Sequence, residues 1–224
     1  MTIHFGIKFA IYQTFKFLYH AGINKLSTFA KNNEMILPIR AYGDPVLRQK
    51  AIDIDKDYKH LSQLIDNMFD TMSDANGVGL AAPQVGLAIR LFIVDLTPFT
   101  DDENYEDIAD ELAAFRKVFI NPKITVEKGE EWKFNEGCLS IPGVREDVTR
   151  QETIEIEYYD ENWELHKEEF SDIRARVVQH EYDHIEGVLF TDYLTPFKKK
   201  LIKGKLNNIS KGKVNADYNM QFPN

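Results

Sequence analysis

The residues best suited to chemistry in this sequence are His180, Glu181 and His184, which form the pattern H-E-x-x-H. On a helix, residues four apart lie one above the other, so both imidazoles can reach one metal ion. Glu181 follows the first histidine directly, where a carboxylate can serve as general acid and base. The pattern predicts a metal-dependent hydrolase. Two histidines buried in an ordinary core are the alternative.

Two histidines do not complete such a site, so a third protein ligand decides its class. A third histidine of the long metzincin pattern is absent, because Phe190 stands in its place. The downstream glutamate of other zinc peptidases is absent too, since no glutamate follows Glu186. Cys138 remains as a candidate thiolate ligand, and a Cys/His/His set leaves a fourth position for water. A lone cysteine also fits a small buried hydrophobic side chain or a Cys/His nucleophile pair.

A glycine-rich segment, GVGLAAPQVG over residues 77–86, is a third candidate. Gly79 and the other glycines permit close approach of a backbone, and Gln84 offers a neutral amide that can donate to a developing oxyanion. A phosphate-binding loop is disfavoured, because no Gly-Lys-Ser/Thr follows and the Rossmann spacing is absent.

Hydrophobic periodicity predicts the elements that position these residues. Apolar side chains recur at three- and four-residue spacing over 61–72, which predicts a helix that ends at Asn76 and Gly77. A second helix is predicted from Ser171, as N-cap, to Gly187, and it contains the H-E-x-x-H pattern. Strands are predicted over 90–96, 117–121, 124–127, 153–159 and 163–170, the last two as a hairpin.

The composition limits the classes of function. A length of 224 residues, 43% of them hydrophobic, suits one domain with additional segments. A net charge of -9 argues against a dedicated DNA-binding protein, and no apolar stretch reaches the roughly 18 residues of a membrane span. A single cysteine fits a reducing compartment. We therefore expect a cytoplasmic protein with no DNA partner and no membrane span.

Three segments differ from the predicted domain at 35–196. Residues 1–34 are basic and aromatic, and we expect an N-terminal extension outside the fold, with Met35 as the first residue of the domain. An interfacial amphipathic helix and a targeting segment are the alternatives. An acidic stretch at about 100–113 predicts a solvated insertion. Residues 197–224 form a basic tail, either solvated or in contact with ribosomal RNA.

Taken together and in this order, GVGLAAPQVG, EGCLSIPG and QHEYDHIEGVLF resemble the three signature motifs of the peptide deformylases. The resemblance extends from about Met35 to about Leu194. It implies an α+β fold with antiparallel β-sheets wrapped around a central helix that carries the H-E-x-x-H motif. It implies one divalent metal ion held by Cys138, His180 and His184, natively Fe²⁺ and often replaced by Zn²⁺, Ni²⁺ or Co²⁺.

The resemblance also implies the reaction and the catalytic roles. The substrate is the N-formylmethionyl end of a nascent peptide, from which formate is released by hydrolysis. The positions that match the family motifs imply that Glu181 is the general acid and base, and that Gln84 and the backbone N–H of Leu139 stabilise the oxyanion. Two rivals stay open: an H-E-x-x-H metallopeptidase that cleaves internal peptide bonds, and a non-catalytic deformylase-like module that binds ribosomes.

The same resemblance points to residues that bind the peptide. Val78, Gly79 and Gly137 match positions where the backbone holds the substrate in extended form, and Arg145 matches a basic residue on the substrate side. Arg176 departs from the family pattern, which commonly has an apolar residue lining the methionine pocket one turn before the first histidine.

Overall fold

A computed structural model describes residues 35–223 of the chain, so the extension expected at 1–34 lies outside the described residues. The main sheet is antiparallel, in the order β2-β3-β4-β5-β6. Its strands are β2 (Gly79–Ala81), β3 (Leu91–Asp95), β4 (Arg116–Gly137), β5 (Arg145–Tyr159) and β6 (Leu165–Phe170). A second sheet pairs β1 (Ile39–Arg40) with β7 (Met220–Gln221) and is parallel, unlike the antiparallel sheets that the sequence led us to expect.

The helices are α2 (Leu61–Asp74), α3 (Ala109–Ala113), α4 (Asp172–Ile185) and α5 (Pro196–Ile209). Short 3-10 helices connect the elements: η1 (Pro45–Arg48), η2 (Ala82–Val85), η3 (Thr97–Phe99), η4 (Glu103–Ile108) and η5 (Phe190–Tyr193). This mixture of helices and an antiparallel sheet is the α+β fold that the resemblance implied. No helix in the described part of the chain is long and apolar enough to cross a membrane.

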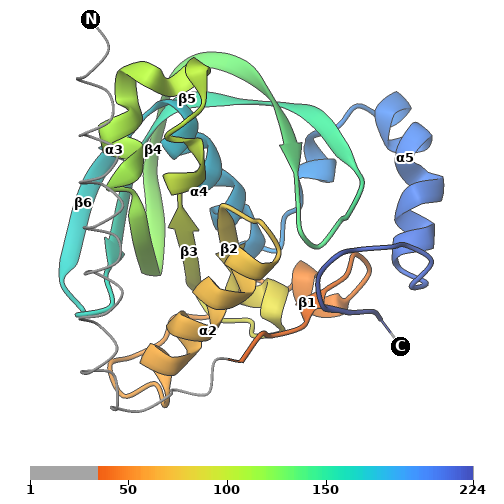
Figure 1. Cartoon of the computed structure of the whole chain (residues 1–224), viewed down its shortest axis with the longest axis horizontal. Coiled ribbons are helices and arrows are strands. Elements are labelled where there is room, and N and C mark those ends of the chain that lie inside the picture. The colour runs from red at the N-terminus through yellow and green to blue at the C-terminus, as the bar shows by residue number, and fades with distance from the viewer. Residues whose placement is uncertain (1–34, 224) are drawn as a thin grey trace, which may run out of the picture. The chain divides into compact units, whose positions relative to one another are not determined.

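The two long helices near the sheet pack on opposite faces of it. Successive side chains of a strand point to opposite faces, so Phe92 and Val94 of β3 join the core under α4, while Ile93 joins the core under α2. Figure 1 shows α4 in the middle of the domain, with the long β4–β5 hairpin bending around it. The helix that carries the H-E-x-x-H pattern is therefore enclosed by the sheet.

The bend of β4 explains one difference from the sequence prediction. The strands expected at 117–121 and 124–127 are parts of one strand, and its register with β5 shifts between Ile120 and Lys123. At this point Asn121 has a φ of 49°, and its side chain bonds both the N–H and the carbonyl of Ile54, at 2.9 and 2.7 Å. A bulge of this kind increases the twist of a strand without ending it.

The end of α4 agrees with the prediction, and its start differs in detail. Gly187 has a φ of 75°, and its N–H and that of Val188 donate to carbonyls of the last helical turn. At the start, the Ser171 side chain makes no capping bond, and the carboxylate of Asp172 instead accepts from the N–H of Arg174 at 3.0 Å. The pattern therefore lies in the last turns of a firmly terminated helix.

The described part of the basic C-terminal segment, residues 197–223, packs on the domain. Thr195 caps α5, and Ile202, Leu206 and Ile209 bury its inner face against a core shared with Val144 and Val148. Four of the five lysines of this helix are exposed, and the fifth, Lys198, is half-buried and pairs with Glu146. The apolar residues of α5 recur at helical spacing, but lysines stand between them. The strongly basic composition of the segment therefore made this periodicity hard to recognise.

The acidic stretch at about 100–113 is solvated only in part. It forms η4 and α3, and Leu112 is completely buried. Tyr105 and Ile108 pack against the same core as α4, while the acidic side chains face outward. The segment is thus a short helical cap on the sheet.

Candidate active site

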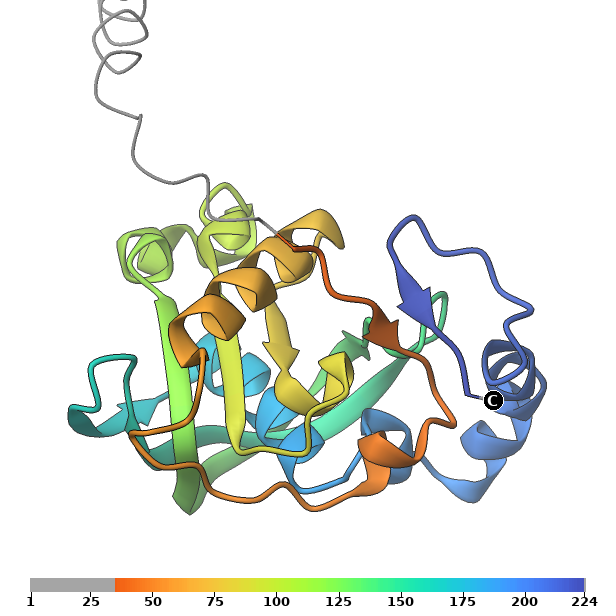
Figure 2. The same ribbon diagram turned by 90° about the horizontal axis from the view of Figure 1, so that it is seen from below.

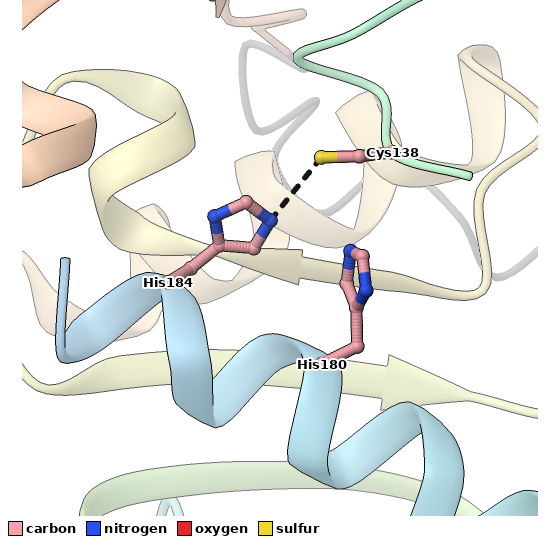
Figure 3. Close-up of side chains that lie close together, drawn as sticks. All are labelled: Cys138, His180 and His184. Atoms are coloured by element: carbon pink, nitrogen blue, oxygen red, sulfur yellow. Dashed lines mark hydrogen bonds between the residues drawn. The ribbon is translucent and has the colours of Figure 1, made fainter. Parts of the chain in front are cut away.

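Three sequence-predicted residues, Cys138, His180 and His184, meet beside α4. The two histidines project from successive turns of α4, and Cys138 follows the end of β4 (Figure 3). Their donor atoms all lie within 4.8 Å of one another, and the Cys138 Sγ is 3.2 Å from the Nε2 of His184. Residues more than 40 positions apart in the sequence are thereby brought to one point.

The chemistry of this donor set fits a divalent transition metal. One thiol and two imidazoles are ligands that such metals prefer, and three protein ligands leave room for water or substrate. Burial lowers the pKa of His184 well below its usual value, which keeps the imidazole in the neutral form that binds metals. The His180 Nδ1 is engaged with Glu136 at 2.9 Å, so its Nε2 is the nitrogen left for a metal.

Glu136 is the centre of a buried polar network behind the donor set. Its carboxylate accepts from Arg150 at 2.7 and 3.0 Å and from Arg176 at 3.0 Å, besides its contact with His180. Burial by itself raises the pKa of Glu136, but the bonds from His180 and Arg150 outweigh it and hold the pKa well below its ordinary range. Arg150 also donates to Asp183 at 2.7 Å. The network fixes the orientation of the His180 ring.

Glu181 is buried near the donor set, on the wall of the cavity. Its Oε2 is buried and has no hydrogen-bond partner among the described residues. Burial raises the pKa of this carboxylate to about 7. A carboxylate with a pKa near neutrality can both accept and return a proton, as general acid–base catalysis requires.

Two hydrogen-bond donors lie beside Cys138. The Gln84 Oε1 accepts from the N–H of Ala81 at 2.8 Å, which directs the amide nitrogen toward the Cys138 Sγ at 3.5 Å and the Ser140 Oγ at 3.4 Å. The N–H of Leu139 donates to no acceptor between residues 35 and 223. The Gln84 amide nitrogen thus lies beside Cys138, and the N–H of the following residue has no acceptor among the described residues.

All but one of the predicted site residues line a single cavity of about 700 Å³. They are Val78, Gly79, Gln84, Gly137, Cys138, Leu139, Arg145, His180 and Glu181. His184 lies behind them, in contact with Cys138. Arg145 pairs with Gly137 across the β4–β5 hairpin and donates to the side chain and carbonyl of Asn135.

Arg176, where the chain departs from the family pattern, also reaches this cavity. Its guanidinium is 4.3 Å from the centre of the Trp132 ring and donates to the Trp132 carbonyl at 2.8 Å. The rest of this wall is apolar, with Phe134, Ile173 and Val177. The guanidinium of Arg176 is turned toward Glu136, to which it donates a hydrogen bond. The cavity therefore keeps an apolar recess at Phe134, Ile173 and Val177.

Three residues at the site, Glu136, Arg150 and Tyr218, were not expected from the sequence. Glu136 stands two residues before Cys138 in the same motif, and a carboxylate in that position is a signal that could have been used. Arg150 reaches the site only through the register of β4 and β5, which pairs it with Trp132. Tyr218 contacts Leu139 from 79 positions away, and no local pattern indicates it.

The α+β fold, together with a thiol, two imidazoles and an enclosed carboxylate in one cavity, defines the class of metal-dependent hydrolases. Comparisons with known proteins identify the family. Residues 36–200 match the family model described as polypeptide deformylase. The chain belongs to this family, whose members are metal-dependent enzymes that remove the formyl group from an N-terminal methionine. The family expected from the three motifs is thereby confirmed.

Individual relatives give the same result. A peptide deformylase of Christiangramia forsetii is 65% identical over 85% of this chain and 97% of its own length. One of Flavobacterium psychrophilum is 61% identical over 84% and 97%. Among solved structures, a peptide deformylase from Legionella pneumophila is similar with a TM-score of 0.68 and 35% identity, over 80% of this chain and 98% of that one.

Proposed function

We propose that Cys138, His180 and His184 hold one divalent metal ion. We propose further that Glu181 is the general acid and base in hydrolysis of the N-formyl group of nascent polypeptides. The observation that carries the assignment is the convergence of these three donor atoms within 4.8 Å of one another, beside a cavity that Cys138 and His180 line. When bound, the metal supplies a Lewis acid that activates water and polarises the formyl carbonyl. Family membership fixes the reaction as hydrolytic removal of the formyl group from N-terminal methionine, with release of formate.

The residues of the chain carry the proton transfers and the charge. Glu181 takes the proton of the attacking water and later gives it to the leaving amine, a role that its pKa of about 7 supports. The Gln84 amide and the Leu139 N–H donate to the oxyanion, and the loss of one such donor costs on the order of a hundredfold in rate. The apolar recess at Phe134 and Val177 takes the methionine side chain.

The peptide backbone binds along the cavity in extended form. Val78, Gly79 and Gly137 offer backbone groups there, and Arg145 supplies a positive charge at the rim. A Cβ on Gly137 would lie 2.7 Å from a guanidinium nitrogen of Arg145, so the glycine leaves room for that side chain. This packing supports a substrate-binding role for both residues.

We assign Fe²⁺ as the native metal, with Zn²⁺, Ni²⁺ and Co²⁺ as substitutes. A ligand set with one thiolate is softer and more easily oxidised than three histidines. The Fe²⁺ form should therefore lose activity faster in air than under nitrogen, whereas the Ni²⁺ form should not. Equal decay of the two forms in air would contradict this assignment.

We place the enzyme in the cytoplasm, where its nascent substrates emerge, and propose a ribosome contact through the C-terminal segment. Support comes from α5, which exposes Lys200 and Lys203 beside Phe197 and Leu201. Co-sedimentation with ribosomes should weaken as salt is raised and when both lysines are replaced by glutamate. Unchanged co-sedimentation of that variant would remove this proposal and leave the catalytic one intact.

The deciding experiment measures formate release from formyl-Met-Ala-Ser by protein that is purified without oxygen and loaded with Fe²⁺ or Ni²⁺. We expect release by the parent, and loss of release in Glu181→Ala and in Cys138→Ala. Acetyl-Met-Ala-Ser and longer acetylated peptides serve as controls. Cleavage of internal bonds would favour the metallopeptidase, and a metal-loaded parent without any release would favour the binding module.

A further inference from the structure

The chain returns to the active site after α5. Residues 215–218 line the same cavity as Cys138, and the strand that follows them, β7, pairs with β1. Figure 2 shows this last segment running back from α5 to lie beside β1. The match to the family model ends at residue 200, so none of the three motifs assigns a role to this part of the cavity wall.

Tyr218 makes the direct link between this segment and the catalytic loop. Its hydroxyl donates to the carbonyl of Leu139 at 2.7 Å, and its ring packs in the same core cluster as the Leu139 side chain. Burial raises the pKa of Tyr218, so the hydroxyl keeps its proton and remains a donor. The bond joins residues that are 79 positions apart.

Hydrogen bonds accepted by its backbone carbonyls hold the loop that begins at Cys138. The Cys138 carbonyl accepts from the N–H of Ile141 at 2.9 Å, and the Ser140 carbonyl accepts from the N–H of Tyr42 at 2.8 Å. The bond from Tyr218 adds the Leu139 carbonyl between them. Three successive carbonyls are thereby fixed, while the Leu139 N–H has no acceptor among residues 35–223.

We propose that Tyr218 is a positioning residue for the oxyanion hole: its hydroxyl fixes the backbone of Leu139 so that the N–H of this residue points at the developing oxyanion. The inference rests on the proposed function, because it requires the Leu139 N–H to be an oxyanion donor. The Leu139 N–H shares a rigid peptide unit with the Cys138 carbonyl, which Ile141 holds, and the Leu139 carbonyl belongs to the next unit, so the two groups turn relative to each other only at the Leu139 Cα. Holding the carbonyl limits that rotation. A donor that is slightly misplaced loses transition-state stabilisation more than substrate affinity.

Tyr218→Phe tests the inference, because it removes one oxygen atom and leaves the ring in its packing. We expect kcat for formyl-Met-Ala-Ser to fall about threefold to tenfold, as the loss of one hydrogen bond predicts. KM should stay within about twofold, since the donor acts mainly on the transition state. Assays are run well below the unfolding temperature of the variant, with metal content measured in each sample.

Tyr158→Phe is the matched control. Its buried hydroxyl bonds Lys117 and Glu168 on the β5–β6 side of the sheet, away from the cavity. This variant should lower the unfolding temperature and leave kcat unchanged. A purely structural role for Tyr218 would give the same result as this control.

The outcomes separate the inference from the proposed function. An active parent with unchanged kcat in Tyr218→Phe overturns the positioning role and leaves the deformylase reaction standing. A raised KM with unchanged kcat overturns it as well, because the segment would then only bind the peptide. A metal-loaded parent that releases no formate overturns the proposed function itself.

Discussion

The carboxylate of Glu181 packs directly against the backbone of Gly79 on strand β2, so closely that a Cβ on Gly79 would lie 2.7 Å from the Glu181 Cδ. Real Cβ atoms do not come this near to another heavy atom, so either the strand or the carboxylate would have to move. Gly79 therefore defines the position of the proposed general base as well as the wall of the cavity. Sequence alone suggests only that this glycine permits close approach.

Gly79→Ala is therefore expected to displace Glu181 and lower kcat by roughly tenfold or more, because small errors in the position of a catalytic group are costly. Metal content should be unchanged, since the three atoms nearest to the added Cβ all belong to Glu181 and none to the three donors. Gly204→Ala in α5 is the control, because its added Cβ meets nothing within 4 Å. Steady-state kinetics with metal analysis measures both, and parent-level kcat in Gly79→Ala would contradict the prediction.

Glu136→Gln is expected to weaken metal binding about tenfold to a hundredfold, as the loss of a partner behind a ligating histidine typically does. The substitution removes the charge that His180, Arg150 and Arg176 share. Titration against a competing chelator measures the affinity. Glu168→Gln, in a network away from the cavity, should bind metal like the parent.

Chelator treatment should lower the unfolding temperature of the metal-loaded parent, because a ligand that binds only the folded state stabilises it. Cys138→Ala should show a much smaller shift, since one of the three donors is gone. Thermal scans with and without chelator give both values. Equal shifts in the two proteins would argue against Cys138 as a ligand.

Leu206→Ala should destabilise the domain by about 2–4 kcal/mol, the usual cost of truncating a buried leucine. Leu206 is 9% exposed on the inner face of α5, whereas Leu201 on the outer face is 64% exposed. Leu201→Ala should therefore change the free energy of unfolding little. Urea unfolding compares the two variants, and equal effects would mean that α5 contributes no core.

Acid should remove the contribution of the ion pair between Asp192 and Arg48. Burial raises the pKa of Asp192, but the bonds from Arg48 and from the Leu189 N–H outweigh it and lower the pKa below its usual value. A carboxylate with a lowered pKa stabilises the fold above its unfolded pKa of about 4, and this stabilisation is lost as the pH falls through the folded value. The free energy of unfolding should thus differ between parent and Asp192→Asn at pH 7, and the difference should shrink as the pH falls below the unfolded pKa of about 4. A constant difference would contradict the assignment.

Local spacing made the helix with His180 and His184 predictable, because the separation of the two residues already determines their common face. The reaction was predictable only from the resemblance of three motifs to a known family. Local spacing also located the helices at 61–74 and 172–185 within a few residues. Spacing could not reveal Arg150, whose approach depends on a strand register that a bulge near Asn121 alters. Nor could it reveal α5, where lysines conceal the apolar face.

The position of Tyr218 has a consequence for synthesis of the enzyme itself. His184, the last donor, leaves the ribosome 34 residues before Tyr218 (218 − 184). A growing copy can therefore contain every donor and still lack part of the cavity wall. This part of the cavity wall is therefore completed last, after the segment that follows α5 has emerged and joined β1.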